Sequence, residues 1–228
     1  MKIPSFKSRS NELERIDRGD FTTEEYARWK KEMIVVHSLF GECRAMKRSL
    51  IAEVEGNPAN QVSILDVGAG TGDLTVKLKT EFDGKSVFIV GADVSPDSTN
   101  ALKANEIVPV RCDALSLPFA ENSFDYVFCT LFLHHLDEEA AIKLMGQMKR
   151  VARNKIFIID LDRNPLAYYL FKLFGFVFLQ PFTREDGALS ILRAYTEPEL
   201  RKLAASAGLT KINIQRSQIN RLILSGSS

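Results

Sequence analysis

One short stretch, Ile64–Thr75, constrains the fold of this chain more than any other, and it reads Ile-Leu-Asp-Val-Gly-Ala-Gly-Thr-Gly-Asp-Leu-Thr. An apolar run, Val62–Val67, meets glycines at positions 68, 70 and 72, and a helical pattern follows. This order of strand, glycine turn and helix brings bare backbone N–H groups close to a ligand. Glycine suits such a turn because it tolerates positive φ and has no Cβ to block the approach.

The spacing of these glycines narrows the class of ligand. It is Gly-x-Gly-x-Gly, whereas a loop that binds a dinucleotide pyrophosphate has Gly-x-Gly-x-x-Gly. Asp66, two residues before Gly68, favours a ligand that brings positive charge near the loop. The alternative is a tight strand-to-helix turn that binds nothing.

The composition fits one large domain, or one domain with an added lid, in a chain of 228 residues. Lys plus Arg number 30 and Asp plus Glu number 29, so the chain lacks the basic excess typical of nucleic-acid binding. Cys43, Cys112 and Cys129 are widely spaced, which fits neither a disulfide framework nor a zinc site. The chain begins without a secretory-type apolar run, so we expect free thiols and a cytoplasmic location.

A second apolar stretch, Leu166–Phe182, is rich in Leu and Phe but contains Lys172, Gly175 and Pro181. It is shorter than the roughly 20 apolar residues of a membrane-spanning helix. We therefore expect no transmembrane segment here, but a helix that is buried or lines a pocket. Peripheral membrane contact is the minor alternative.

The N-terminal region is predicted to be helical. Thr22 and Glu25 have the spacing of a capping box. Residues that recur every three or four positions then define one face of a long helix: Trp29, Met33, His37, Phe40 and Arg44. We expect this face to pack on the body of the protein or to cover the ligand site, with Arg44 or His37 reaching in.

Strands and helices alternate after the turn at positions 56–60. The predicted strands are Val62–Val67, Ser86–Val94, Val108–Cys112, Phe124–Thr130 and Lys155–Leu161. The predicted helices are Thr71–Phe82, Pro96–Asn105 with Ser95 as its cap, and Asp137–Val151. Such alternation indicates a parallel sheet with helices on both faces, which binds ligands at the carboxyl ends of its strands.

The alternation stops at Asp162–Tyr195, a long insertion before the next helix. That helix, Glu197–Ala207, is preceded by a second capping box formed by Thr196 and Glu199. Two final strands are predicted at Thr210–Arg216 and Arg221–Leu224. The short connection at 217–220 predicts that these two strands pair antiparallel.

Three carboxylates, Asp66, Asp93 and Asp113, stand at the ends of three successive predicted strands. A carboxylate after the second strand is placed to accept hydrogen bonds from two ribose hydroxyls. Asp113 is placed to accept from an exocyclic amine such as that of adenine. Each Asp alone is also an ordinary cap or turn residue, but their order beside the glycine loop points to an adenosine-containing ligand.

Three segments together resemble the Rossmann-like, class I methyltransferases that depend on S-adenosylmethionine (SAM). They are Ile64–Gly72, Gly91–Pro96, and Arg111–Ala114 followed by Leu117–Val127. The similarity covers about residues 62–161 and is greatest to the small-molecule branch with the ubiquinone, menaquinone and polyketide-associated methylases. It implies an α/β fold with a Rossmann-like, seven-stranded, mostly parallel sheet and an antiparallel last strand. Helices cover both faces, and an N-terminal helical extension and a lid insertion are added.

The resemblance also implies a domain organisation and a cofactor, SAM. Residues 1–56 would form a helical cap and residues 57–228 the SAM-binding domain, with the lid at 162–195. The expected cofactor-binding residues are Asp66, Gly68, Ala69, Gly70, Thr71, Gly72, Asp93, Val94, Asp113, Ala114 and Thr130. In this family pattern Asp93 would take the ribose hydroxyls, Val94 would pack on the adenine, and Thr130 would offer its backbone to the methionine amine.

Two adjacent histidines, His134 and His135, follow the fourth strand and are the candidate catalytic residues. Methyl transfer mostly requires in-line positioning and exclusion of water, and a base helps only if the acceptor must lose a proton. Histidine suits the deprotonation of a phenol or enol. A matching His is frequent in quinone methylases, which favours His135. The alternative is that the pair caps the next helix or packs structurally. We expect no metal because adjacent histidines point in different directions.

The insertion is expected to select the methyl acceptor, because relatives place substrate-selecting elements there. Its first half is apolar and aromatic, and its second half, residues 182–196, resembles the lid of a bacterial methyltransferase subgroup linked to polyketide or quinone-like pathways. This resemblance implies a hydrophobic aromatic, polyketide or quinone-like small molecule that is methylated on a hydroxyl or activated carbon. The expected acceptor contacts are Tyr168, Tyr169, Arg184 and Arg193. Alternatively, the insertion completes the core or a dimer face, and we expect a monomer or homodimer.

Two other functions remain open: an RNA or protein methyltransferase, and a SAM-binding protein without transfer activity. The fourth strand continues as Cys129–His135 and lacks the Asn-Pro-Pro-Tyr motif of nucleic-acid amine methylases. No nucleic-acid partner is therefore expected.

Overall fold

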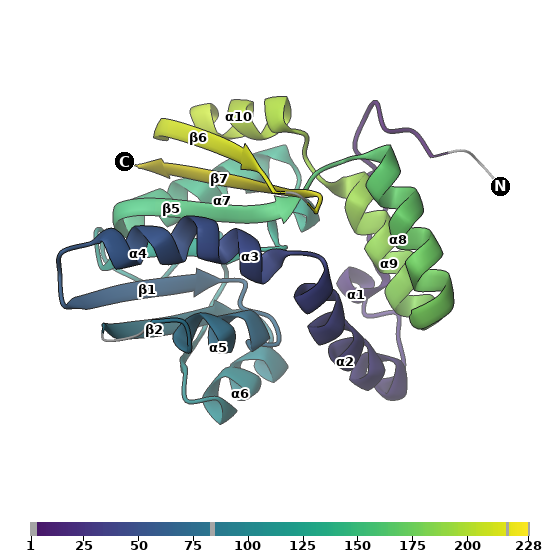
Figure 1. The fold of residues 1–228 in the computed structure, drawn as a ribbon, viewed down its shortest axis with the longest axis horizontal. Coiled ribbons are helices and arrows are strands. Elements are labelled where there is room, and N and C mark those ends of the chain that lie inside the picture. The colour runs from purple at the N-terminus through teal and green to yellow at the C-terminus, as the bar shows by residue number, and fades with distance from the viewer. Residues whose placement is uncertain (1–3, 83–84, 218, 228) are drawn as a thin grey trace.

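The computed structural model describes residues 4–82, 85–217 and 219–227, which form one seven-stranded sheet flanked by helices (Figure 1). The strands are β1 (Gln61–Val67), β2 (Ser86–Asp93), β3 (Val108–Arg111), β4 (Phe124–Thr130), β5 (Ala152–Leu161), β6 (Thr210–Arg216) and β7 (Arg221–Ser227). Their order across the sheet is β3-β2-β1-β4-β5-β7-β6.

Ten α-helices and two shorter helical stretches lie within the described residues. The N-terminal helices are α1 (Arg15–Arg18), α2 (Thr23–Leu39), α3 (Glu42–Met46), the π-helical stretch η1 (Lys47–Ile51) and α4 (Ala52–Gly56). The helices between strands are α5 (Asp73–Lys79), α6 (Pro96–Ala104), the 3₁₀ turn η2 (Leu133–His135) and α7 (Glu138–Val151). The later helices are α8 (Pro165–Phe178), α9 (Pro181–Arg193) and α10 (Glu197–Ser206).

The strand directions confirm the predicted fold. β1 pairs in parallel with both β2 and β4, and β4 pairs in parallel with β5. β7 lies antiparallel between β5 and β6, so the last strand alone runs against the others. The predicted β6–β7 hairpin is present; Gln218, in its connection, lies outside the described residues. The strand order reverses between β1 and β4, and their carboxyl ends therefore border the crevice where such sheets bind ligands.

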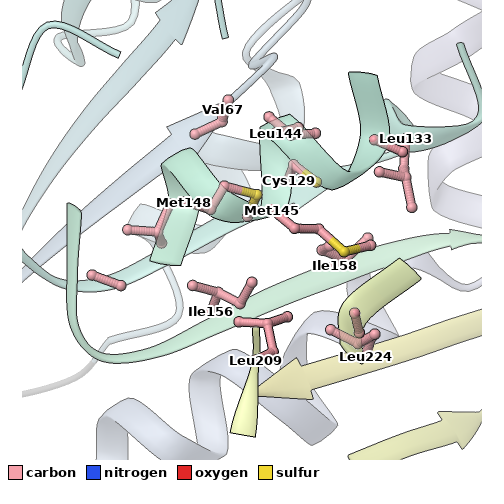
Figure 2. Close-up of a cluster of buried hydrophobic side chains, with 14 of the residues drawn as sticks. Val67, Cys129, Leu133, Leu144, Met145, Met148, Ile156, Ile158, Leu209 and Leu224 are labelled. Carbon is pink, nitrogen blue, oxygen red and sulfur yellow. The ribbon is translucent and has the colours of Figure 1, made fainter. Parts of the chain in front are cut away.

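Two apolar cores, one on each face of the sheet, hold the helices in place. On one face α7 and α10 pack on the central strands, around side chains such as Cys129, Met145 and Ile158 (Figure 2). On the other face α3, η1, α4, α5 and α6 pack around Ile64, Phe128 and Phe157. Because both faces are covered, the middle strands read as nearly continuous apolar runs.

The predicted helix starts are also present in the structure. Thr22 and Glu25 form the first capping box, and Thr196 and Glu199 form the second. Ser95 and Asp137 cap α6 and α7 through their side chains. Three elements differ from the prediction by more than one residue: the helix after the glycine loop is shorter, Asp73–Lys79, β5 begins earlier, at Ala152, and β7 continues to Ser227.

The prediction of one helix face from Trp29 to Arg44 is wrong. α2 ends at Leu39, and Gly41 then adopts a φ of 94° before α3 begins. Arg44 therefore lies on a different helix, where it is exposed. The helices from Glu42 to Gly56 pack on the sheet. Within the N-terminal region, therefore, the part before Glu42 covers the cavity at the strand ends.

The insertion at 162–195 is a pair of packed helices, α8 and α9, beyond the strand ends (Figure 1). A Cβ on Gly187 would lie 2.4 Å from the ring of Phe171, so these helices approach closely. The helix predicted at Leu166–Phe182 lines a cavity, as one of its two alternatives had it, but α8 ends at Phe178 and keeps one apolar face exposed. Within the described parts of the chain, no helix is both long and apolar enough to cross a membrane.

Candidate active site

A cavity of about 1010 Å³ lies where β1, β2, β4 and β5 end. Its floor consists of the loops after these strands, and its walls come from the N-terminal segment, α2, α8 and α9. The apolar part of the wall includes Trp29, Met33, Phe40, Phe132, Leu166, Leu170, Phe171 and Ile191. Ligand pockets commonly have about 300–1,000 Å³, so this cavity has room for a cofactor and a second molecule.

The glycine loop presents its backbone to this cavity. Gly68, Gly70 and Gly72 have φ values of 74°, 54° and 75°, which favour glycine. A Cβ on Gly68 would lie 2.8 Å from the ring of Phe132, whereas one on Gly70 would meet no atom nearer than 4.0 Å. Gly68 is thus needed for packing, and Gly70 leaves open space above the loop. Ala69 and Thr71 also line the cavity.

Asp93, at the end of β2, fastens this loop. Its Oδ2 accepts a hydrogen bond of 2.8 Å from the Gly70 N–H, and its Oδ1 accepts one of 2.8 Å from the Ser95 N–H. Each carboxylate oxygen can accept a second hydrogen bond, so both remain available to a ligand in the cavity. Val94, beside it, lines the cavity and is 67% exposed.

Asp66 is a buried carboxyl group beneath the same loop. It accepts a short hydrogen bond from the Thr75 hydroxyl, and it is 3% exposed. Burial raises the pKa of Asp66 to about 7, an effect that the Thr75 hydrogen bond partly offsets. A cationic ligand group nearby would favour the ionised form of this carboxyl.

Thr130 ends β4 at the cavity, and its hydroxyl has no hydrogen-bond partner among the described residues. A buried hydroxyl without a partner is destabilising, so this position suits a polar ligand group. Gly72, Asp113 and Ala114 do not line the cavity. Asp113 is exposed and accepts a hydrogen bond of 2.8 Å from the Leu115 N–H. The adenine contacts expected of Asp113 and Ala114 therefore stay predictions.

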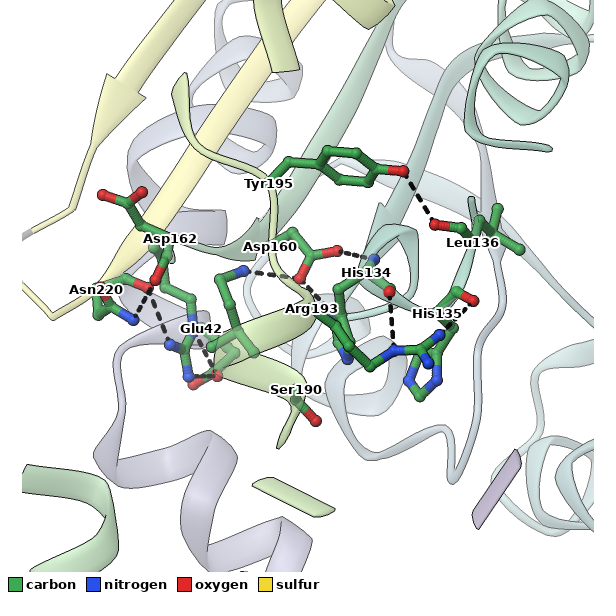
Figure 3. Close-up of polar contacts among 12 residues, drawn as sticks. Glu42, His134, His135, Leu136, Asp160, Asp162, Ser190, Arg193, Tyr195 and Asn220 are labelled. Carbon is green, nitrogen blue, oxygen red and sulfur yellow. Dashed lines mark hydrogen bonds and ion pairs between the residues drawn. The ribbon is translucent and has the colours of Figure 1, made fainter. Parts of the chain in front are cut away.

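His134 lines the cavity from η2, and Asp160 of β5 holds its ring (Figure 3). The ring Nδ1 lies 2.7 Å from Asp160 Oδ1, and the backbone N–H of His134 donates to Asp160 Oδ2 at 3.0 Å. Burial would raise the pKa of Asp160, but the charge and hydrogen bonds of His134 outweigh it and lower that pKa. We assign the proton to Nδ1, which leaves Nε2 free to accept one.

His135, the next residue, also lines the cavity and is held by the N-terminal segment. Its Nδ1 lies 2.8 Å from Asp17 Oδ1. The rings of His134 and His135 have centroids 4.2 Å apart, tilted by 35°. The predicted pair therefore forms one unit, and each ring is oriented by a carboxylate from a distant part of the chain.

Glu14 completes this unit, and no sequence motif identified it. Its Oε1 lies 3.8 Å from His134 Nε2 and 4.0 Å from His135 Nδ1, with no hydrogen bond to any described residue. Its Oε2 accepts a hydrogen bond of 2.8 Å from the Ser190 hydroxyl. Burial raises the pKa of Glu14 to about 7. A carboxyl and two imidazoles with uncommitted atoms thus meet at the cavity wall.

The same three residues are the candidate metal ligands in the described chain, with one potential ligand atom each within 4.8 Å of the others. The expectation of no metal rested on the directions of the two histidines and on the lack of a nearby partner in the sequence, and it did not include Glu14. Arg193 Nε lies 3.5 Å from Glu14 Oε1 and already supplies positive charge there, which disfavours a metal ion. The absence of a metal stays a prediction.

A pH titration of stability tests whether Glu14 is neutral in the folded protein. The pKa of Glu14 is about 7 in the folded state against an ordinary value of 4.5. Because the folded pKa is the higher one, stability is lost as the pH rises from about 4.5 to about 7. Between pH 4.5 and pH 7 we expect the unfolding free energy of wild type to fall by about 3 kcal/mol relative to that of Glu14→Gln. The difference between the two proteins should not grow further above that range. Urea unfolding at several pH values measures this difference.

The exposed neighbour offers a matched control, because Glu12→Gln removes a carboxylate from the same segment. A plot of the unfolding free energy of Glu12→Gln against pH should run parallel to that of wild type. Parallel curves for Glu14→Gln and wild type would contradict a neutral Glu14.

The four predicted acceptor contacts do not line the cavity. Arg193 is buried behind the histidines, where it donates to the carbonyl oxygens of His134 and His135 at 3.3 and 2.7 Å (Figure 3). Tyr168 is buried, Tyr169 is exposed, and Arg184 lies over the ring of Phe176. Arg193 thus positions the turn that carries the histidines, and acceptor contact by these four residues stays a prediction that the cavity does not support.

His37 of α2 does line the cavity, as the sequence allowed, whereas Arg44 does not. The ring Nδ1 of His37 lies 2.9 Å from Asp73 Oδ2, at the start of α5. Burial would raise the pKa of Asp73, but the hydrogen bond and charge of His37 outweigh it and lower that pKa. His37 therefore ties the covering helix to the glycine loop.

Comparison with known proteins identifies a methyltransferase domain within the chain. Residues 64–155 match the family model for a methyltransferase domain. Over 116 residues the chain is 31% identical to the ubiquinone/menaquinone biosynthesis C-methyltransferase of Xanthomonas campestris. This alignment covers 47% of this chain and 45% of that protein. The chain is 28% identical over 179 residues to the demethylmenaquinone methyltransferase of Oceanobacillus iheyensis. That alignment covers 66% of this chain and 71% of the relative. The chain thus spans about half the length of the ubiquinone/menaquinone methylases that it matches.

Solved structures agree on the fold. Magnesium protoporphyrin IX methyltransferase from Synechocystis PCC 6803, with bound SAH, superposes with a TM-score of 0.62 at 18% identity, covering 93% of this chain and 99% of that chain. Human N-acetylserotonin methyltransferase superposes with a TM-score of 0.65 at 15% identity. The superposition covers 95% of this chain and 62% of the human chain. Residues 64–155 are thus a methyltransferase domain, and the chain has the fold of the class I, SAM-dependent methyltransferases and resembles the quinone methylases.

Proposed function

We propose that this chain transfers a methyl group from SAM to a hydroxyl or activated carbon of a hydrophobic, aromatic or quinone-like small molecule. One observation carries the proposal: a single cavity holds the glycine loop with Asp93, an apolar wall, and the Glu14–His134–His135 cluster. Donor and acceptor could therefore lie side by side, enclosed by the covering helices. The names of the quinone C-methyltransferases that the chain resembles support the same acceptor class.

The floor of the cavity fits SAM chemically. Asp93 would accept the two ribose hydroxyls, and Val94 offers an apolar surface for the adenine. Asp66 would face the positive charge of the methionine part, and the unpaired Thr130 hydroxyl offers it a further polar contact. When bound, SAM supplies a methyl group on a positively charged sulfur, which needs no further activation.

The apolar wall would position the acceptor. Trp29, Met33, Phe40 and Phe171 offer aromatic and aliphatic surface, with polar groups confined to the floor and the histidine side. Such a wall desolvates the acceptor and orients it in line with the methyl group, which is the main requirement of this reaction.

The cluster of Glu14, His134 and His135 would receive the proton of the acceptor hydroxyl. Nε2 of His134 can take it because Asp160 engages Nδ1, and the Asp160 carboxylate would stabilise the resulting imidazolium. The acceptor oxygen or carbon would then be the nucleophile for the methyl group that bound SAM would supply.

Transfer of isotope-labelled methyl groups tests the acceptor class. The full chain is incubated with labelled SAM and, separately, phenolic and quinol-like molecules, bulk RNA, and lysate protein. We expect label in the organic-soluble phenol or quinol fraction. Label in RNA or protein would overturn the proposal in favour of a macromolecular methylase. Binding of SAM without transfer to any acceptor would favour a binding protein.

A further inference from the structure

The outer face of α8 is a stripe of large apolar side chains open to solvent. Leu166, Leu170, Leu173, Phe176 and Val177 are 68%, 56%, 65%, 74% and 63% exposed. Their spacing of three or four residues places them on one side of the helix. The opposite side, with Tyr168, Phe171 and Gly175, is buried. A helix that is apolar all round is normally covered all round.

The packing of α8 on α9 prevents the helix from turning this stripe inward. A Cβ on Gly175 would lie 2.8 Å from Cβ of Arg184, and a Cβ on Gly187 would lie 2.4 Å from Phe171. At these points the two helices pack with almost no space between them. The N-cap Asn164, which accepts hydrogen bonds from the N–H groups of Leu166 and Ala167, fixes the start of the helix. The exposed stripe is therefore a stable feature of the surface.

The charged groups at the border of the stripe are cationic. From Arg163 to Arg184 the chain contains no acidic residue; Arg163 is buried and paired with Glu199, which leaves the half-buried Lys172 and Arg184 as the charges beside the stripe. Lys172 lies at the border of the stripe, 5.5 Å from the Tyr168 ring, and the guanidinium of Arg184 lies 5.8 Å from the Phe176 ring. An apolar stripe with Lys and Arg at its border suits the boundary between anionic headgroups and acyl chains.

The stripe is continuous with the cavity. Leu166 and Leu170 are exposed and also line the cavity wall, together with Ala167 and Phe171 of the same helix. A second protein seated on the stripe would cover this edge of the cavity. A lipid surface would instead place the acyl phase next to it, and an apolar acceptor could pass between the two without entering water.

We propose that α8 docks the protein on an anionic lipid bilayer, lying in the interface rather than crossing it. With 14 residues the helix is about 21 Å long, which suits an in-plane position. Docking makes the lipid phase the source of the acceptor, and this last step alone rests on the proposed function.

Vesicle sedimentation tests the docking directly, without SAM or acceptor. We expect the full chain to bind vesicles that contain phosphatidylglycerol, and to bind pure phosphatidylcholine vesicles more weakly. Phe176→Glu should weaken binding at least about tenfold, because it removes an aromatic side chain that the docked protein would bury in the bilayer. Phe88→Glu, the same change at a residue of β2 that is 55% exposed, should have no effect. Lys172→Gln and Arg184→Gln should each weaken binding to the anionic vesicles by about fivefold.

The contrary outcomes are distinct. No vesicle binding by wild type, or equal binding by the Phe176 and Phe88 variants, would overturn the proposal. So would a wild-type dimer that Phe176→Glu dissociates without any vesicle binding, which would assign the stripe to a second copy. An unchanged affinity of Phe176→Glu for SAM shows that its fold is intact, whereas absence of SAM binding by wild type would count against the function and not against the docking.

Discussion

Replacing Glu42 with Ala is expected to lower the unfolding free energy by about 3–5 kcal/mol, because it leaves a buried guanidinium without its counter-charge. Glu42 begins α3 and is 0% exposed, and Arg221, which begins β7, is 4% exposed. Arg221 Nε donates to Glu42 Oε1 at 2.7 Å, and its Nη2 donates to the same oxygen. Without Glu42, the guanidinium stays buried and keeps its hydrogen bond to the Asn220 carbonyl, at 3.1 Å. Denaturant unfolding measures the loss.

Two further variants separate the buried charge from ordinary effects of truncation. Glu42→Leu combined with Arg221→Met removes both charges and should recover most of the lost stability, because apolar groups of similar volume replace the pair. Lys47→Ala breaks an exposed pair with Glu81 on the same helical segment and should leave the unfolding midpoint nearly unchanged. A Glu42→Ala variant as stable as wild type would show that the buried pair contributes nothing.

Replacing Asp93 with Ala is expected to weaken SAM binding about 100-fold. The variant lacks the carboxylate, so it would lose two charge-assisted hydrogen bonds to the ribose, worth about 1.5 kcal/mol each. The Gly70 N–H would also lose its partner, which loosens the glycine loop. Trp29 is the only tryptophan and lines the cavity, so its fluorescence reports binding.

The matched control for this variant is Asp125→Ala. Asp125 also accepts a backbone hydrogen bond, from Ser63 at 2.8 Å, but it lies at the start of β4, away from the cavity. Its loss should leave SAM affinity unchanged. Equal affinities of wild type and Asp93→Ala would remove Asp93 from the cofactor site.

The fold was largely predictable because its signals are local. β4 is Phe124–Thr130, as predicted, since this run is rich in β-branched and aromatic residues. The capping boxes at Thr22 and Thr196 marked helix starts because their hydrogen bonds join residues three apart. The break after α2 also had a signal, Gly41, a residue typical of helix ends, which the periodicity through Arg44 concealed.

The site was predictable only where one loop or one strand end forms it. The glycine loop and Asp93 reach the cavity because adjacent parallel strands end there. Glu14 meets His134 across 120 positions of sequence, and no local pattern indicates such a contact. Arg193 lies close to the two histidines but contacts their backbone from behind the cavity, since a sequence does not show which side of a helix faces a cavity. For the same reason, the apolar pattern of α8 predicted a helix that is buried or lines a pocket, and it did not indicate the exposed face.

The most direct test of SAM binding at the glycine loop is a calorimetric titration of SAM into the wild-type chain. We predict one site per chain, displacement by S-adenosylhomocysteine, no comparable binding of a dinucleotide such as NAD, and strong weakening in Asp93→Ala. Absence of SAM binding by the folded wild-type chain, or preference for the dinucleotide, would contradict this assignment.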